Sequence, residues 1–429
     1  MTNATKRGDA YFFGVPRTVT EATENLPKDR PGEQEKSNKT AGRNAGGRLK
    51  KRLRPVIPGG KTGDPDRVLL FLILILIAIG SVMVCSASHA YAESRYGDGG
   101  YFSRKQIVFV ALGLLIMLIV SRVPPYIIRQ AAFPLYLLTV LLLLATLAFG
   151  LTGNGAQRWI AIGPLTFQPS ELAKLSLVLM LARYFSSPGH LREPGERGRF
   201  LHGIVYPLLF IGLICVLVVL QRHLSGLIIL GSIGITLIFL AGSPGKPLLF
   251  LCGAGAAGVS ALAFTLEYAR ERITVWQNPE AFPLAGGWQT LQGLMAIGSG
   301  GFFGLGLGKS RMKYSWVSEP ANDFIFTITC EELGFLGALT ILAVFALFIR
   351  RGFTVALHNE DCFSRIAALG ITVKVAIQVL LNIAVITNSI PNTGISLPFF
   401  SYGGSSLLML FAEMGILLSV SRSSALTYR

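Results

Sequence analysis

Charged side chains are scarce in this chain. Only 14% of its 429 residues are Asp, Glu, Lys or Arg, whereas 51% are hydrophobic. The mean hydropathy is accordingly high, at +0.54. An average soluble domain carries about 25% charged residues, so this scarcity excludes an ordinary soluble fold. The composition is typical of a protein that crosses a membrane several times.

Cysteine is rare as well. The chain has five cysteines, which are scattered and form no Cys-x-x-Cys pair, and its five histidines show no ligand spacing. Disulfide frameworks and structural zinc sites both need such clusters. The sequence therefore predicts neither a disulfide framework nor a metal site.

Ten apolar runs approach the length of about 20 residues that a hydrocarbon core about 30 Å thick requires. The second and the fourth are short. We expect an all-α polytopic membrane protein with ten transmembrane helices and a large extracytoplasmic loop between helices 7 and 8. The predicted spans are residues 68–88, 107–120, 131–151, 172–185, 203–220, 224–241, 247–266, 324–349, 366–387 and 401–420.

The positions of Lys and Arg in short loops predict the orientation. Arg122, Arg183 and Arg350 share one side with the basic segment ahead of the first span. This side is predicted to be cytoplasmic, so both termini are cytoplasmic. Lys309 and Lys313 then lie outside, against the usual distribution. They indicate either an anionic ligand there or charges that reach the interface from helix ends.

Two terminal regions flank the membrane domain, which we place at residues 68–421. Residues 1–67 lack apolar periodicity and predict a disordered basic cytoplasmic tail, and residues 422–429 a short cytoplasmic C-terminal tail. The cluster from Arg48 to Arg54 lies close to the first span. We expect it to bind anionic lipids. Nucleic-acid binding is not expected, because no aromatic residues are interleaved with the charges.

Polar residues open the fourth span. Ser170 fits a helix N-cap, and Glu171 and Lys174 are three residues apart, so they share one helix face and can form an ion pair. Such a pair is either a packing contact or part of a cavity wall, and the residues alone leave both open. Trp159, in the preceding loop, is more typical of a membrane-interface aromatic than of a platform for substrate stacking.

A polar loop runs from Trp288 to Asp323, directly ahead of the eighth span. Its Gly-rich part, 298–310, ends like a phosphate-binding loop, but Phe303 replaces a required Gly and the segment follows no strand. We interpret it as a re-entrant turn that packs closely on neighbouring helices. Asp323 precedes an apolar helix, so it is either the helix N-cap, which the residues alone favour, or a general base at the mouth of an outer cavity.

Seven segments together resemble the SEDS family (shape, elongation, division and sporulation). The resemblance covers residues 68–421 and leaves the tail uncovered. Within the family, the Gly-Leu-Gly-Lys-Ser-Arg-Met-Lys segment is more similar to division members than to elongation members, and sporulation members come next. The segments are Gln157–Trp159, Phe167–Lys174, Ala296–Gly301, Gly306–Ser310, Asp323–Phe326, Glu332–Phe335 and Leu397–Ser406.

The resemblance implies an enzyme that polymerises peptidoglycan glycan strands from lipid II on the outer face of the bacterial cytoplasmic membrane. The family's essential aspartate matches Asp323. Two departures are visible. The family's Pro-Glu-x-His-Thr-Asp is Ser318–Asp323 here, so no imidazole stands in that motif. The family's Pro-Asp-Leu-Gly after the fifth span is Arg222-His223-Leu224-Ser225, which lacks the carboxylate and adds positive charge.

In such a reaction the 4-hydroxyl of an acceptor sugar attacks C1 of a donor sugar, and undecaprenyl pyrophosphate leaves. One carboxylate suffices as base, and cations must stabilise the pyrophosphate. No cofactor is required, although a divalent cation, Mg²⁺ or Mn²⁺, would serve the same purpose. We expect Asp323 to be catalytic and the substrate-binding residues to be Arg158, Trp159, Glu171, Lys174, Lys309, Lys313, Ser401 and Ser405.

The expected partners are lipid II, the growing glycan strand, a class B penicillin-binding transpeptidase and divisome membrane proteins. Two other functions stay open. A flippase or transporter of the same lipid-linked precursor would also have a polar cavity, although the chain shows no clear duplicated halves. A scaffold for the transpeptidase would not need its polar cavity residues.

Overall fold

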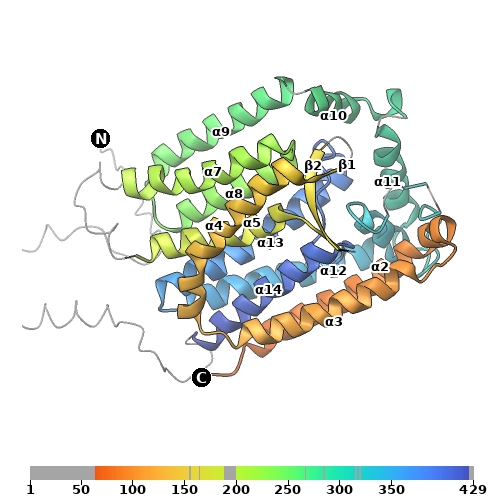
Figure 1. Cartoon of the computed structure of the whole chain (residues 1–429). Helices are drawn as coiled ribbons and strands as arrows, with labels where there is room; N and C mark the ends of the chain where they lie inside the picture. Colours follow the sequence, from red (N-terminus) through yellow and green to blue (C-terminus); the bar gives the residue numbers. More distant parts are fainter. Residues whose placement is uncertain are drawn as a thin grey trace, which may run out of the picture. The chain divides into compact units, whose positions relative to one another are not determined.

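The computed structural model describes residues 63–153, 156–163, 165–187, 200–265, 267–283, 286–314, 316–317 and 320–424. Residues 1–62 of the predicted N-terminal tail, with its basic cluster, and residues 425–429 of the predicted C-terminal tail lie outside these ranges. Within them, a helix lies at each predicted span (Figure 1). These helices are α2 (Arg67–Tyr96), α3 (Tyr101–Ser121), α4 (Pro125–Phe149), α5 (Pro169–Phe185), α7 (Tyr206–Leu220), α8 (Leu224–Leu240), α9 (Gly245–Thr265), α12 (Ile325–Leu357), α13 (Cys362–Ile386) and α14 (Gly404–Arg422).

The helical membrane fold is confirmed. In the part of the chain that the structure describes, seven helices are long and apolar enough to cross a membrane, and α8 is a shorter apolar helix. One of the seven is α7 extended by a π-helical turn, η1 (Leu201–Val205). The short second run proves to be the end of a longer helix, because α3 begins at Tyr101. The short fourth run, α5, has 17 residues and is buried along nearly its whole length.

A small antiparallel sheet, which the sequence analysis did not predict, lies between α4 and α5. Its strands are β1 (Leu151–Gly153), β2 (Ala156–Ile162) and β3 (Leu165–Phe167), in the order β1-β2-β3. Trp159 pairs with Leu151 on one side, and Ile160 pairs with Phe167 on the other. The sheet therefore holds the Arg158-Trp159 segment close to the first turn of α5.

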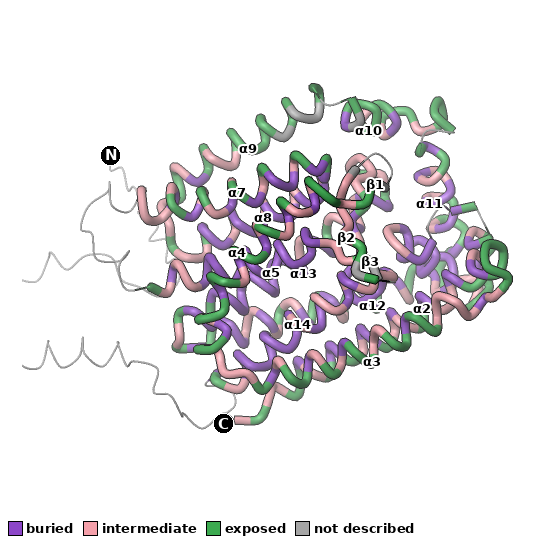
Figure 2. The backbone as a smooth tube through the Cα atoms, viewed as in Figure 1, coloured by how far each residue is buried: buried purple, intermediate pink, exposed green. Residues whose placement is uncertain are grey.

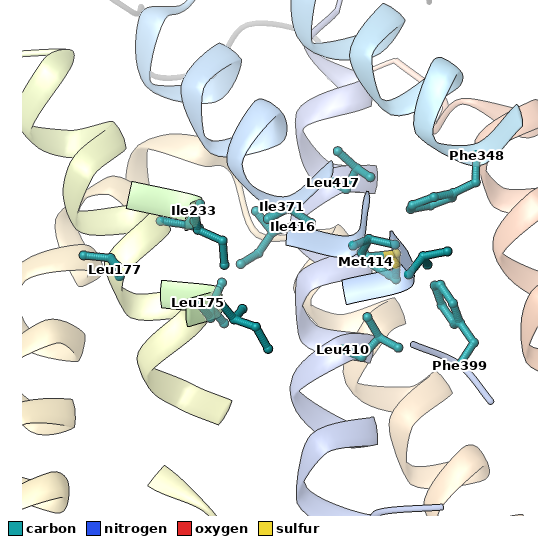
Figure 3. Packing of buried hydrophobic residues seen from close by; sticks show 14 of the residues in the cluster. Leu175, Leu177, Ile233, Phe348, Ile371, Phe399, Leu410, Met414, Ile416 and Leu417 are labelled. Carbon is teal, nitrogen blue, oxygen red and sulfur yellow. The ribbon is translucent and has the colours of Figure 1, made fainter. Parts of the chain in front are cut away.

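The buried centre of the bundle consists of α5, α13 and α14. Figure 2 shows these helices mostly buried, while α9 is largely intermediate or exposed. Helix α5 packs against α4, α8 and α13, and α14 packs against α3. Phe348, Phe399 and Met414 gather beside α14 (Figure 3), and the ring centroids of Phe348 and Phe399 are 5.9 Å apart. Polar side chains inside this centre are thus surrounded by packed apolar groups.

The segment between α9 and α12 is partly helical, with α10 (Glu267–Gln277), η2 (Pro279–Ala281) and α11 (Gly287–Ser299). The Gly-rich turn that follows packs its backbone against α12, as predicted. The amide of Leu305 donates to the carbonyl of Glu331 at 3.0 Å, and the amide of Phe335 to the carbonyl of Gly301 at 2.9 Å. Helix α12 is interrupted at Gly334, whose φ is 68° and where a Cβ would lie 2.2 Å from the amide nitrogen of Gly304. Only glycine fits this contact.

Candidate functional site

A polar cavity of about 830 Å³ opens among the β2 strand, the first turn of α5, the turn before α8, and the α10–α11 region. A volume in the range of about 300–1,000 Å³ suits a small-molecule or sugar ligand. Four of the predicted substrate-binding residues, Arg158, Trp159, Glu171 and Lys174, line this cavity together with the predicted catalytic residue Asp323. The structure thus brings together segments that are more than 160 positions apart in the sequence.

Arg158 and Trp159 reach the cavity from β2. A guanidinium nitrogen of Arg158 donates to the backbone carbonyl of Arg222 at 2.5 Å, so the sheet is tied to the turn before α8. Arg222 itself has a φ of 54°, an uncommon backbone conformation for a residue with a side chain. This conformation starts the turn that brings His223 to the cavity wall.

Glu171 and Lys174 form the ion pair that their spacing predicts. The Nζ of Lys174 lies 2.7 Å from a carboxylate oxygen of Glu171, and the two side chains are 5% and 11% exposed. Both line the cavity, so this pair is part of a cavity wall rather than a packing contact alone. The proposed N-cap was wrong: Gln168 is the N-cap of α5 and Pro169 its first residue, so Ser170 lies inside the helix.

A smaller chamber of about 20 Å³ continues from the same wall. Glu171 and Gln378 line both spaces, and Lys374 and Ser401 line the chamber. Behind it, Lys374 on α13 pairs with Glu413 on α14 at 2.6 Å. The volume is enough for about one water molecule. A second buried ion pair thus stands next to the first.

Asp323 stands immediately before α12. The N-cap of α12 is Phe324, so the interpretation of Asp323 as the N-cap was wrong. The side-chain amide of Asn382 donates to the backbone carbonyl of Asp323 at 2.9 Å and to that of Ile395 at 2.7 Å. A Cβ at Gly394 would come within 3.0 Å of a carboxylate oxygen of Asp323. The loop containing Gly394 therefore packs closely against this carboxylate at the cavity wall.

Ser401 contacts the segment that precedes α12 and carries Asp323. Its hydroxyl donates to the backbone carbonyl of Asn322 at 2.9 Å and accepts from the amide of Leu397 at 2.7 Å. The amide of Tyr402 donates to the carbonyl of Ala321 at 2.8 Å. These contacts fix the backbone that leads to α12. Ser405 is buried in the first turn of α14 and lines neither space.

The predicted lysines of the Gly-rich turn lie elsewhere. Lys313 is buried and pairs with Glu332 at 3.1 Å, and its Nζ also donates to the carbonyl of Gly308 at 2.6 Å. Lys309 is exposed, and neither lysine is a lining residue of the cavity. Of the predicted cationic binding residues Arg158, Lys174 and Lys309, only the first two line the cavity. Glu331 and Glu332, near the start of α12, are both buried in the interior.

The cavity lining combines charges of both signs. Arg222 and Arg272, which the sequence analysis did not select as binding residues, add cations, and Glu271 adds a carboxylate. His223, in the turn between α7 and α8, remains uncharged: burial lowers its pKa to about 3, and the neighbouring cation Arg158 acts in the same direction. Polar residues inside predicted spans, such as Lys374 and Gln378, were a signal that could have identified the inner wall.

We next consider whether the cavity lining offers ligands for a metal ion. Among the described residues, no group of three or more His, Cys, Asp and Glu side chains could hold one. Glu171 is already paired with Lys174. The described residues therefore form no multi-ligand cluster of the kind that holds a structural metal ion.

The comparisons with known proteins agree with this architecture. A family model described as a cell cycle protein of the FtsW, RodA and SpoVE type matches residues 66–426. Stage V sporulation protein E of Bacillus subtilis (strain 168) is 37% identical over 367 residues, which are 85% of this chain and 99% of that protein. A probable peptidoglycan glycosyltransferase FtsW of Geobacter sp. (strain M18) is 34% identical over 358 residues, covering 83% and 96%.

Solved structures are similar over the same length. A chain from a peptidoglycan synthase complex, described as coordinating polymerization and crosslinking, has a TM-score of 0.68 and 29% identity, covering 83% of this chain and 98% of that one. The rod shape determining protein RodA of Thermus thermophilus has a TM-score of 0.62 and 30% identity, covering 84% and 98%.

Proposed function

Because this chain belongs to the FtsW, RodA and SpoVE family of cell cycle proteins, the SEDS family, we propose that it is a peptidoglycan glycosyltransferase that polymerises glycan strands from lipid II. The observation that carries the proposal is the cavity of about 830 Å³ lined by Asp323 and by several cations. Relatives with FtsW names are described as probable peptidoglycan glycosyltransferases at 34–35% identity over most of the chain.

In the proposed reaction, Asp323 accepts the proton of the acceptor's 4-hydroxyl as that oxygen attacks C1 of the donor sugar. A C1–O4 bond forms, the bond from C1 to the pyrophosphate oxygen breaks, and undecaprenyl pyrophosphate leaves with the electron pair. Arg158, Arg222 and Arg272 line the cavity and are suited to stabilise the charge that develops on this pyrophosphate. A separate general acid is unnecessary, since pyrophosphate leaves as an anion.

Positioning follows from the contacts around Asp323. Asn382 and Ser401 bond to consecutive backbone carbonyls, those of Asp323 and Asn322, so the carboxylate is carried by a fixed segment. The charges of Glu171 and Lys174 neutralise each other, because the two groups lie 2.7 Å apart. We assign Glu171 and Lys174 to the shape and polarity of the wall, and Asp323 to the proton transfer.

The proposal includes the sidedness and the partners. The chain is a multi-pass membrane protein. We place the cavity on the outer face and both termini in the cytoplasm, because loops between the other helix ends carry most of the Lys and Arg. A structural relative belongs to a complex that couples polymerisation to crosslinking. The partner would accordingly be a class B penicillin-binding transpeptidase, with divisome membrane proteins beside it.

The cellular role is septal cell-wall synthesis in this proposal, with sporulation as a second candidate that the relative from Bacillus subtilis favours. Complementation of strains that lack either the division or the sporulation member distinguishes the two roles. Restored septation without restored spore formation is expected. The reverse result would assign the chain to sporulation.

The biochemical test is strand formation from labelled lipid II by the purified protein, with and without a cognate transpeptidase. Asp323→Asn should lower the rate by about 10²–10⁴-fold, the usual contribution of a positioned general base. Asp98→Asn is the control: Asp98 lies in the turn between α2 and α3, and its carboxylate pairs with Arg104 outside the cavity. A flippase would instead move labelled lipid II across vesicles without making strands, and a scaffold would do neither.

A further inference from the structure

Four aromatic side chains form a row, the aromatic row, that begins at the cavity wall. Tyr402, in the segment before α14, lines the cavity. The ring of Phe102 lies edge-on to that of Tyr402, with the ring centroids 5.0 Å apart, and the ring of Tyr101 lies edge-on to Phe102 at 5.2 Å. Tyr96 stacks on Tyr101 at 4.3 Å, with an angle of 15° between the rings. The aromatic row thus leads from the cavity to the end of α2.

The turn between α2 and α3 sets the outer part of this row. Helix α2 ends at Tyr96, and its C-cap, Gly97, has a φ of 67°, the left-handed conformation that commonly ends a helix. Helix α3 begins at Tyr101, so the stacked rings belong to the last residue of one helix and the first residue of the next. Figure 1 shows this turn at the end of the bundle remote from the C-terminus, which is the end that we place outside.

The rings of the row are accessible and already ordered. Tyr96 is 49% exposed, and Tyr101, Phe102 and Tyr402 are partly exposed. Stacking on Tyr101 covers one face of the Tyr96 ring, and the exposure comes from its remaining surface. The Nζ of Lys105 donates to the hydroxyl oxygen of Tyr101 at 2.6 Å and lies 4.1 Å from the centre of its ring. Rings that are fixed before binding lose little entropy when a ligand binds to them.

The chemistry of the row suits sugar rings. A pyranose ring has C–H groups on its faces and hydroxyls at its rim, and a tyrosine has an apolar face and one hydroxyl, so both apolar and polar parts are matched. A polyprenyl chain would not match a row that starts at a cavity lined by Arg158, Arg222 and Arg272. Several rings in succession suit a chain of sugars better than a single sugar.

We infer that Tyr402, Phe102, Tyr101 and Tyr96 form a binding surface for the sugar rings of the growing glycan strand. The inference rests on the proposed function, because a polymerase must hold a product that extends beyond its cavity. Sugars close to the reacting end contact Tyr402, and sugars further along the strand contact Tyr96. The surface retains the strand between successive additions, so that one bound strand becomes longer before it dissociates.

The test compares strand length with the rate of the first coupling. Purified wild type and variants polymerise labelled lipid II, and strand lengths are measured after equal consumption of lipid II. Tyr96→Leu keeps an apolar side chain and removes the flat ring. It should shorten the mean strand about tenfold, the order of a lost stacking contact. The rate of joining the first two lipid II molecules should fall less, because so short a product does not reach Tyr96. Tyr96→Trp, which has a flat ring, should restore the strand length.

Tyr126→Leu is the matched control. Tyr126 is 42% exposed, similar to Tyr96, but it lies in the first turn of α4, at the end of the bundle where α3 ends. This variant should keep the strand length of wild type. Thermal unfolding checks that every variant is folded. A second measurement needs no catalysis: a lipid-free glycan fragment of several disaccharide units is bound to Asp323→Asn, and its affinity should fall about tenfold when Tyr96→Leu is added.

The failures of the two proposals are distinguishable. If wild type makes strands and Tyr96→Leu makes strands of the same length, the row only packs the α2–α3 turn, and the inference is wrong while the glycosyltransferase assignment stands. If Tyr96→Leu and Tyr96→Trp shorten the strands equally, a flat ring is not what binds, and the inference is wrong as well. If wild type makes no strands, the proposed function fails, and fragment binding alone decides: equal affinity with and without Tyr96→Leu overturns the inference, and a tenfold loss supports it.

Discussion

Lys374 on α13 and Glu413 on α14 form an ion pair in the buried centre, with a distance of 2.6 Å between Nζ and the carboxylate oxygen and side chains only 4% and 1% exposed. The perturbation is Lys374→Met, which has a similar length and no charge. It leaves the carboxylate of Glu413 without its cation. Removing one partner of a buried pair destabilises a protein by about 3–5 kcal/mol. Glu171 lines the same small chamber as Lys374 and loses a nearby cation too, which favours the upper part of that range.

The assay is thermal unfolding of the purified protein in detergent. The unfolding entropy of globular proteins is about 2.1 cal/mol/K per residue, and about 360 residues form the membrane domain. The expected decrease in Tm is therefore about 4–7 °C. The double variant Lys374→Met with Glu413→Leu should recover most of this loss, because apolar pairs often replace buried ion pairs at little cost.

The control is Lys246→Met, which removes an exposed lysine at the start of α9 and should leave the Tm unchanged. If Lys374→Met is as stable as wild type, the carboxylate of Glu413 does not need the cation of Lys374, and the reasoning is wrong. A double variant no more stable than the single variant would show that the lysine stabilises the bundle by packing instead of by charge.

Three further predictions concern other parts of the molecule. Gly334→Ala should destabilise the Gly-rich turn and lower the Tm, since φ is 68° and a Cβ would lie 2.2 Å from the amide nitrogen of Gly304; limited proteolysis between α11 and α12 would detect the loosened turn. The pKa of His223 is lowered from 6.5 to about 3 in the folded protein. Between these two pH values the unfolded chain binds a proton that the folded protein does not, so the free energy of unfolding falls as the pH decreases from 6.5 toward 3. The free energy of unfolding of wild type should thus decrease by about 2 kcal/mol between pH 6.5 and 5, and that of His223→Gln should decrease less. Unfolding measured at both pH values checks this. Deletion of residues 1–45, with Arg48–Arg54 retained, should preserve strand synthesis in vesicles; a large loss at unchanged thermal stability would contradict the proposed separation of tail and site.

The helices were predictable because an apolar run of membrane length has few alternatives to a transmembrane helix. The Glu171–Lys174 pair was predictable too, because a spacing of three residues places two side chains on one helix face. Both features depend on residues that are close in the sequence. The part of the site that lies within α5 could accordingly be identified before the structure was known.

The remaining features depend on contacts between distant segments. The sheet around Trp159 forms because the seven-residue strand β2 pairs with two strands of only three residues each. Ser170 and Asp323 have the side chains that cap helices, yet α5 begins at Pro169 and α12 at Ile325. Pro169 is itself a local start signal, because proline is favoured at the first helical position. Lys313 lies on the predicted outer side, but its partner Glu332 is 19 positions away and turns its charge into a structural contact.

Two kinds of contact hold the charged residues of the site. Inside the helical centre, the charges of Lys174, Glu171, Lys374 and Glu413 are joined in two ion pairs, since an isolated charge among apolar helices would be too costly. Because the two charges of each pair offset each other, the pairs leave little electrostatic field for a substrate. Asp323 is held differently: Asn382 fixes its backbone, and its carboxylate lies at the cavity. We therefore place the chemistry where the polar loop meets the bundle, at the carboxylate of Asp323, and the four charges of the buried centre are joined in pairs behind it.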